Sequence, residues 1–164
     1  PPDLFKPPCM PSGLAAYLKY SPEVSCPGSV PCALRDPGQI SGNIRQSAVR
    51  YKGEVRPSRD PAFKQFESMP WGYRAIFVLL DTYRIRHGLE TIRGMISRWA
   101  PPSENHTEIY IRAVADAVGI ADDRPVDTRD RTTMLRMAAA ISRVENGTAA
   151  DMDDVERGWE LFRQ

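Results

Sequence analysis

The sequence predicts an α+β fold that is mostly α, with a small β or irregular region near residues 40–68. The prolines are unevenly placed, since residues 1–60 hold ten of the fifteen. After residue 68 the chain reads as successive amphipathic segments that end at Gly or Pro, which is typical of helices. The 164 residues are 41% hydrophobic and 26% charged, enough for one domain with its own core.

The charge balance excludes several classes of partner. There are 22 Lys and Arg against 21 Asp and Glu, so we expect no nucleic acid or other general polyanion as partner. The sequence contains no apolar run of the roughly 18–20 residues that a membrane span needs, so none is predicted. Phosphate loops, dinucleotide fingerprints and EF-hands are also missing from the sequence, and we expect no cofactor.

Residues 1–35 are predicted to form a Pro-rich N-terminal extension ahead of a domain over 36–164. One short helix is expected there, from Ser12 to Tyr20, with Ser12 as its cap. Cys26 and Cys32 bracket "CPGSVPC", a loop that a disulfide would close in an exported protein. No metal is predicted, because the histidines lie far from these cysteines in the sequence.

Two extended pieces are expected in the β region. They are "GNIRQ" at 42–46 and "AFKQFES" at 62–68. In the second piece Phe63 and Phe66 do not alternate strictly, so the strand pattern is incomplete.

The first long helix is predicted between Ser68 and Gly88. Ser68 is a cap, Pro70 falls in the first turn, and Gly88 follows the end. Its apolar face consists of Trp71, Ala75, Val78, Leu79 and Tyr83. A second helix over 89–100 must stop at Pro101-Pro102, because proline disfavours helix in the residue before it.

Three further helices complete the prediction. Asn105 is expected to cap a helix over 106–118, with Glu108 completing a capping box. A fourth helix starts at Asp127 or Thr128 and ends at Asn146-Gly147, and a short one covers 153–164.

Five stretches of the chain form a recognisable set of motifs. They are "GNIRQ" (42–46), "YKGE" (51–54), "FKQFESMPWGYRA" (63–75), "TYRIRHGLETIRGMISRWAPPSENHTEIYI" (82–111) and "VENG" (144–147). Together they resemble a family of phage and bacterial proteins described as virion structural proteins. The match covers roughly residues 36–147. The chain departs from the family pattern by an insertion in "DPGQISGNIR" and by Tyr51 in place of a tryptophan.

More distantly, the arrangement is similar to lysozyme-like wall hydrolases, namely flagellar-type glucosaminidases and lytic transglycosylases. The resemblance implies a lysozyme-like domain over 36–164 whose partner is peptidoglycan. It also implies a virion-associated or secreted protein that acts in the bacterial periplasm or cell wall.

Glu145 is the principal candidate for a catalytic acid. It falls on the last turn of an apolar helix, in "AAAISRVENG", where lysozyme-like enzymes place their acid. A carboxylic acid buried among apolar neighbours has a raised pKa and can protonate a glycosidic oxygen. The alternative is a solvated acid near a helix end. Glu67 is the candidate for a second carboxylate that stabilises an oxocarbenium-like state.

The Pro-Pro corner supplies two candidate binding residues. Trp99 would stack on a sugar ring and Asn105 would bind an acetamide, or both only build the corner. Asn43 and Arg45 of "GNIR" either contact the substrate or shape a turn. Tyr51 and Tyr110 are expected to line the cleft or the core.

The sequence therefore predicts an enzyme that cleaves glycan strands of peptidoglycan, phage-borne or secreted against other bacteria. A lytic transglycosylase would need a single strong acid, because a hydroxyl of the substrate acts as the nucleophile. The alternative is a non-enzymatic component of a virion or secretion apparatus that binds wall glycan. An immunity protein or a virion or secretion carrier is a candidate protein partner in either case.

Overall fold

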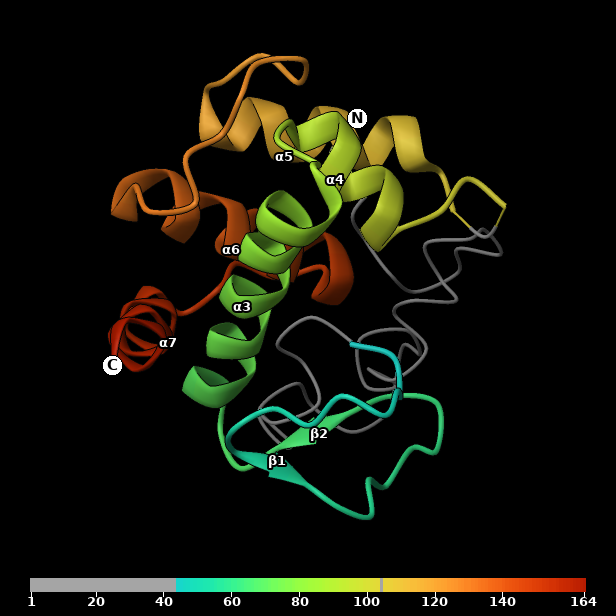
Figure 1. Ribbon diagram of the computed structural model, residues 1–164, viewed down its shortest axis with the longest axis vertical. Coiled ribbons are helices and arrows are strands. Elements are labelled where there is room, and N and C mark those ends of the chain that lie inside the picture. Colours follow the sequence, from blue (N-terminus) through green and yellow to red (C-terminus); the bar gives the residue numbers. More distant parts are fainter. Residues whose placement is uncertain (1–43, 104) are drawn as a thin grey trace.

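The computed structural model describes residues 44–103 and 105–164, and in this part of the chain it confirms a mostly α fold with a small β region. Five helices follow a two-stranded antiparallel sheet within the described residues (Figure 1). The elements are β1 (Glu54–Val55), β2 (Gln65–Phe66), α3 (Met69–His87), α4 (Ile92–Trp99), α5 (Thr107–Val118), α6 (Arg131–Asn146) and α7 (Met152–Arg163). None of these helices is long and apolar enough to cross a membrane.

The predicted Pro-rich extension lies outside the described residues. The same holds for the expected helix over 12–20, the Cys26–Cys32 disulfide and Asn43.

The β region is a short hairpin whose register pairs Glu54 with Phe66. The predicted piece 62–68 contains β2, but of the piece 42–46 the described part contributes only an isolated bridge from Arg45 to Phe63. The strand β1 was not predicted, because "EV" is too short to show an alternating pattern. The hairpin lies at the end of the molecule where α3 begins (Figure 1).

Helix α3 runs through the middle of the fold with the predicted ends. Its predicted apolar face is only partly correct, because of its five residues only Ala75 and Tyr83 are buried. The rest of the buried face consists of Gly72, Tyr73, Ile76, Phe77 and Leu80. Ser68 is its N-cap residue, although its side chain makes no capping hydrogen bond, and Gly88 ends it with a left-handed φ of 64°. Helices α4 and α5 lie near its C-terminal end (Figure 1).

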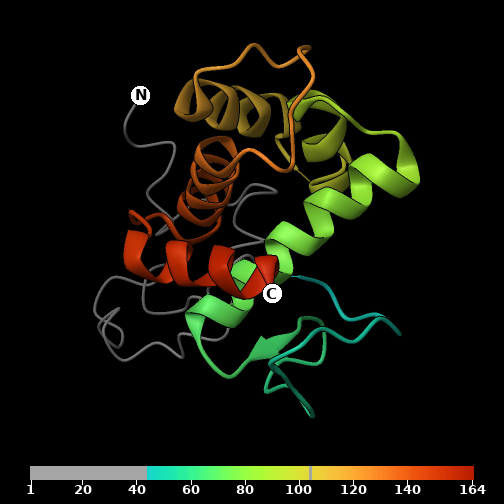
Figure 2. The same ribbon diagram turned by 60° about the vertical axis from the view of Figure 1, so that its left-hand side comes forward.

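Helix α7 packs closely against α3 (Figure 2). The contact needs Gly158, because a Cβ there would lie 2.6 Å from Tyr73 Cβ and 2.8 Å from the Pro70 carbonyl. Beyond it, Trp159 and Phe162 pack on Phe77 with ring centroids 5.3 and 6.0 Å away. The predicted last helix therefore completes the core rather than forming a surface appendage.

Several helix starts differ from the prediction. Helix α4 begins at Ile92 rather than at residue 89, and the Thr91 hydroxyl caps it by accepting a hydrogen bond from the Gly94 N–H at 3.1 Å.

Helix α6 is capped by Asp130, whose carboxylate accepts a hydrogen bond from the Thr133 N–H at 2.9 Å, and not by Asp127 or Thr128. Thr128 is instead buried and donates to Asp81 at 2.6 Å, which ties the loop before α6 to α3. An N-cap side chain must bond the first backbone N–H groups of its helix. Thr128 cannot do so, because its hydroxyl is bonded to Asp81.

The predicted cap of α5 is also wrong. His106 is the N-cap residue, and the Asn105 amide donates to the Pro101 carbonyl at 3.0 Å. The capping box does not form, because the Glu108 carboxylate binds Arg93. The Thr107 hydroxyl donates to the Ala100 carbonyl at 2.6 Å and closes the corner between α4 and α5.

Candidate functional site

Glu145 lies in the last turn of α6 and is fully buried. Its Oε1 accepts a hydrogen bond from the Trp99 indole N–H at 2.9 Å and another from the Tyr110 hydroxyl at 2.8 Å. Trp99 ends α4 and Tyr110 belongs to α5, so three helices meet at this carboxyl group. We call Trp99, Tyr110 and Glu145 the buried triad.

The sequence places Glu145 inward because α6 is buried on a broad face. Ala138, Ile141 and Val144 share that face, and Glu145 follows Ile141 by four residues. Moving a charged carboxylate out of water is costly unless donors compensate it. The indole and phenol donors provide such compensation, so the observed arrangement hides the acid rather than presenting it to a ligand.

Trp99 also lines a pocket of about 200 Å³. One wall of the pocket is the segment 44–51, and the other is formed by α3 and α4. The lining residues are Ile44, Arg45, Ser47, Tyr51, Leu79, Tyr83, Arg98 and Trp99. We call this cavity the aromatic pocket, because two tyrosines and the tryptophan contribute to it.

A buried ion pair holds the 44–51 wall in place. Lys64 Nζ lies 3.2 Å from Glu54 Oε1, and both side chains are inaccessible to solvent. The same ammonium donates to the Val49 carbonyl at 2.7 Å and lies 5.6 Å from the centroid of the Tyr51 ring. The Tyr51 N–H in turn donates to Glu54 Oε2 at 3.0 Å. Lys64 and Glu54 therefore position the wall that carries Tyr51.

Sequence reasoning missed this pair. Lys64 and Glu54 are ten residues apart in the sequence. A lysine in a predicted strand is expected to point to solvent, because lysine is rarely buried. Only the hairpin register brings the two side chains together under the 44–51 wall.

The environment fixes the charge states of this wall. Burial raises the pKa of Tyr51, and the Glu54 carboxylate raises it further, so the phenol stays protonated at neutral pH. For Glu54, burial would raise the pKa, but hydrogen bonds from Arg56, the Tyr51 N–H and Lys64 outweigh it and lower the pKa below its usual 4.5. At neutral pH, Glu54 is therefore ionised and the neighbouring Tyr51 is neutral.

The described lining of the aromatic pocket contains two arginines and no carboxylate. The Arg98 guanidinium lies over the Tyr83 ring, with its carbon 5.5 Å from the ring centroid. Arg45 lies similarly over Phe63 at 5.9 Å. The pocket therefore combines aromatic surface with positive charge.

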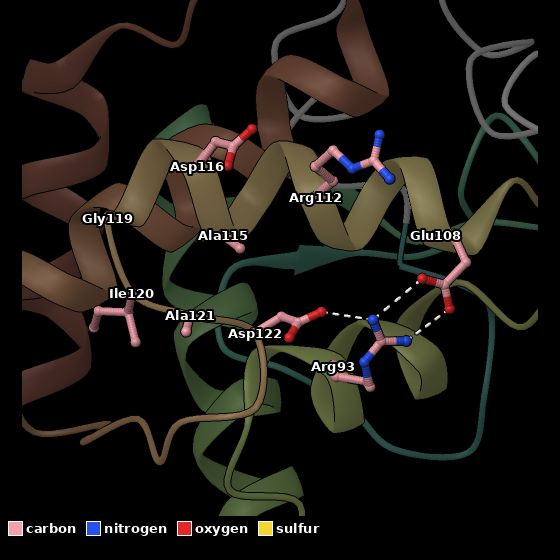
Figure 3. Close-up of a pocket in the computed structure, with 9 residues that line it drawn as sticks. All are labelled: Arg93, Glu108, Arg112, Ala115, Asp116, Gly119, Ile120, Ala121 and Asp122. Carbon is pink, nitrogen blue, oxygen red and sulfur yellow. Dashed lines mark hydrogen bonds and ion pairs between the residues drawn. The ribbon is translucent and has the colours of Figure 1, made fainter.

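A second pocket of about 550 Å³ lies between α4, α5 and the loop 119–122 (Figure 3). The Arg93 guanidinium contacts Glu108 and Asp122 there, each at 2.6 Å. Arg112 and Asp116 point away from this cluster (Figure 3). We call this cavity the ion-pair pocket.

The chain is 34% identical over 121 residues to Protein P5 of Pseudoalteromonas phage PM2. The aligned region covers 72% of this chain and 74% of that protein. The chain belongs to the Protein P5 family. This confirms the predicted relationship to a phage protein family. No family model matches the chain.

For this member of the Protein P5 family, the structure brings some predicted site residues together. Arg45, Tyr51 and Trp99 share the aromatic pocket, and Trp99 links it to Tyr110 and Glu145 of the buried triad. Tyr83 and Arg98 line the same pocket and were not predicted as site residues. From the sequence, Tyr83 was predicted only as part of the apolar face of the first long helix.

Other predicted residues lie apart. Glu67 is exposed after β2, where its N–H donates to the Gly53 carbonyl, and it does not line the aromatic pocket. Asn105 lines a separate cavity of about 300 Å³ beside the start of α5. Among the described residues, no group of three His, Cys, Asp or Glu side chains is placed to hold a metal ion.

Proposed function

We propose that the chain is a virion-associated phage protein that binds peptidoglycan glycan strands in the aromatic pocket. The observation that carries the proposal is the meeting of Tyr51, Trp99 and Arg98 around one cavity of about 200 Å³. Aromatic rings present flat apolar surface to the C–H faces of sugar rings, and nearby polar groups set orientation.

The phage relationship supports a virion as the carrier. Protein P5 belongs to a phage, and a phage particle must attach to or cross the wall of its host. A secreted effector would instead be expected to have an immunity protein as its partner. The lysozyme-like fold that the sequence resemblance implies is compatible with either carrier.

Cleavage of the glycan is the second candidate function, and one observation favours it. Trp99 lines the aromatic pocket and also donates to Glu145, so a modest shift of the indole would connect the pocket to the acid. Glu145 would have to be protonated in that state, and it would give this proton to the leaving glycosidic oxygen as the bond to the anomeric carbon breaks. A hydroxyl of the same sugar would attack the anomeric carbon and pass its proton to the Glu145 carboxylate, which leaves an anhydro product, restores the acid and needs no second carboxylate.

Binding is preferred over cleavage because Glu145 is fully buried in the observed state. A general acid must come within hydrogen-bond reach of the atom that it protonates. Cleavage thus requires a conformational step that binding does not.

One experiment tests both candidates. Purified peptidoglycan sacculi are incubated with the wild type, Tyr51→Ala and Glu145→Gln, then pelleted, and soluble products are identified by mass spectrometry. We expect the wild type and Glu145→Gln to sediment with the sacculi and Tyr51→Ala to remain in solution. Circular dichroism of each variant verifies that it is folded.

The outcomes separate the two functions. Anhydro-muropeptides released by the wild type but not by Glu145→Gln would establish a transglycosylase. Reducing-end products would establish a hydrolase and make Glu67 the next residue to test. If the wild type neither sediments with sacculi from several species nor releases products, both functions are rejected.

A further inference from the structure

We infer that the aromatic pocket selects a sugar unit that carries a carboxylate, and that Arg98 is the side chain that binds this group. The inference rests on the proposed function for the source of the ligand. It adds a specificity that aromatic stacking alone does not supply, because neutral and acidic sugars offer similar ring faces.

The first support is the charge of the pocket. Two arginines line it and none of its described lining residues is a carboxylate. Arg98 makes no ion pair with any described residue, and its guanidinium lies over the Tyr83 ring. Arg98 is exposed at the edge of the pocket, and a cation beside low-dielectric walls attracts an anionic ligand group into the cavity.

The second support is the way Arg98 is held. A guanidinium that lies over an aromatic face keeps its N–H donors in its own plane, and these match the two oxygens of a carboxylate. The Tyr83 ring thus orients Arg98 without using its hydrogen-bond donors. Arg93, at the other end of α4, differs because Glu108 and Asp122 already occupy its donors.

The third support is the size of the cavity. Pockets that enclose drug-sized ligands measure roughly 300–1,000 Å³, so about 200 Å³ accommodates a fragment near the size of one sugar ring. Tyr51, Leu79 and Trp99 supply the surface for the ring. A single acidic sugar therefore satisfies both the apolar wall and the cation.

In peptidoglycan a carboxylate has two sources. The lactyl ether of muramic acid is free where the peptide has been removed, and elsewhere the attached peptide carries carboxylates. Both present the same chemistry to Arg98. N-acetylmuramic acid and muramyl dipeptide are the probes that distinguish them, and N-acetylmuramic acid methyl ester is the neutral control.

The test uses the full chain labelled with ¹⁵N-tryptophan. Each of the three tryptophans gives one indole N–H signal in the NMR spectrum, and Trp71→Phe and Trp159→Phe identify the Trp99 signal by elimination. We expect N-acetylmuramic acid to shift the Trp99 signal with a Kd at least tenfold lower than that of the methyl ester. The preference should vanish in Arg98→Gln, persist in Arg93→Gln, and weaken at high salt.

Several outcomes would decide the matter. Equal affinity for acid and ester, a preference that survives Arg98→Gln, or no binding of either probe would each overturn the inference. Tighter binding of muramyl dipeptide than of N-acetylmuramic acid would support it and assign the carboxylate to the peptide. Unchanged Trp71 and Trp159 signals in Arg98→Gln verify that the variant is folded.

Failure of this inference can be distinguished from failure of the proposed function. Sedimentation with sacculi but no preference for the acid would reject the carboxylate and keep glycan binding. If the protein prefers the acid but does not sediment with sacculi, the carboxylate specificity of the pocket would stand, and peptidoglycan would be rejected as its natural ligand.

Discussion

Helix α4 carries an arginine near each end, and the two lie in very different surroundings. Arg93 contacts the carboxylates of Glu108 and Asp122 in the larger, ion-pair pocket (Figure 3). Arg98 faces the smaller, aromatic pocket and lies over Tyr83. In the larger cavity the central arginine is paired with two carboxylates, whereas the smaller cavity keeps a cation beside aromatic rings. The volume of a cavity is therefore a poor guide here to which cavity binds a ligand.

The pairing around Arg93 explains its role. Hydrogen bonds from the Arg93 guanidinium lower the pKa of Glu108, and the two acceptors raise the pKa of Arg93 itself. The arginine joins α4 to α5 and to the loop that follows α5. It connects these elements, whereas Arg98 is exposed and lies over the Tyr83 ring beside the aromatic pocket.

The largest expected effect concerns the wall of the aromatic pocket. Lys64→Met removes one partner of a buried ion pair and leaves Glu54 with only Arg56 and the Tyr51 N–H as donors, so we expect a loss of about 3 kcal/mol of unfolding free energy. Urea denaturation followed by circular dichroism measures the loss. The control is Arg56→Met, since Arg56 also contacts Glu54 but is 37% exposed, and should cost about 1 kcal/mol or less. Equal losses in the two variants would contradict a structural role for the buried pair.

A smaller effect is expected in the buried triad. Tyr110→Phe removes a hydrogen bond to a buried carboxyl group and should cost about 1.5–3 kcal/mol. Tyr73→Phe is the matched control, because its hydroxyl bonds the neutral Ser142 hydroxyl and its loss should cost about 0.5–1.5 kcal/mol. The same denaturation experiment compares them. A larger loss for Tyr73→Phe would show that the triad contributes less to the fold than its burial suggests.

The pH dependence of stability tests the charge of Glu54. Because the folded-state pKa of Glu54 is lowered, its stabilising contribution is present above the unfolded value near 4.5 and is lost as the pH falls through the folded value. We expect unfolding free energy to fall in acid by up to about 1.4 kcal/mol per pH unit from this group. Glu54→Gln should show a shallower acid slope than the wild type. Parallel slopes would mean that Glu54 is not the titrating group.

The smallest effect is expected at Arg93. Its ion pairs are solvent-exposed, so Arg93→Gln should lower the unfolding midpoint temperature only slightly, and 1 M salt should remove the difference. Differential scanning calorimetry at low and high salt measures it. A large, salt-insensitive loss would show that the two ends of α4 differ less than the contacts indicate.

Most helix ends could be predicted because they depend on local rules. Gly88, Gly119 and Gly147 end helices in left-handed conformations, as their positions after apolar segments predicted. The predicted caps at Asn105 and Asp127 or Thr128 were wrong, because several polar residues compete at each start and tertiary contacts decide among them.

The candidate site was only partly predictable. Trp99 and Glu145 were singled out from the sequence, but they are 46 residues apart and nothing local indicates that they bond. Arg98 and Lys64 were missed, since an exposed arginine on a helix and a lysine in a strand are ordinary surface residues in a sequence.

The sequence by itself determined the helices after residue 68, the Pro-Pro corner and the absence of a strong net charge. These follow from spacing, turn residues and composition, which act over a few residues. Only the tertiary structure decided that Glu145 is hidden by Trp99 and Tyr110, that Lys64 is buried with Glu54, and that Arg98 faces a cavity. Burial and pairing depend on which distant segments pack together, and three-dimensional packing alone fixes that choice.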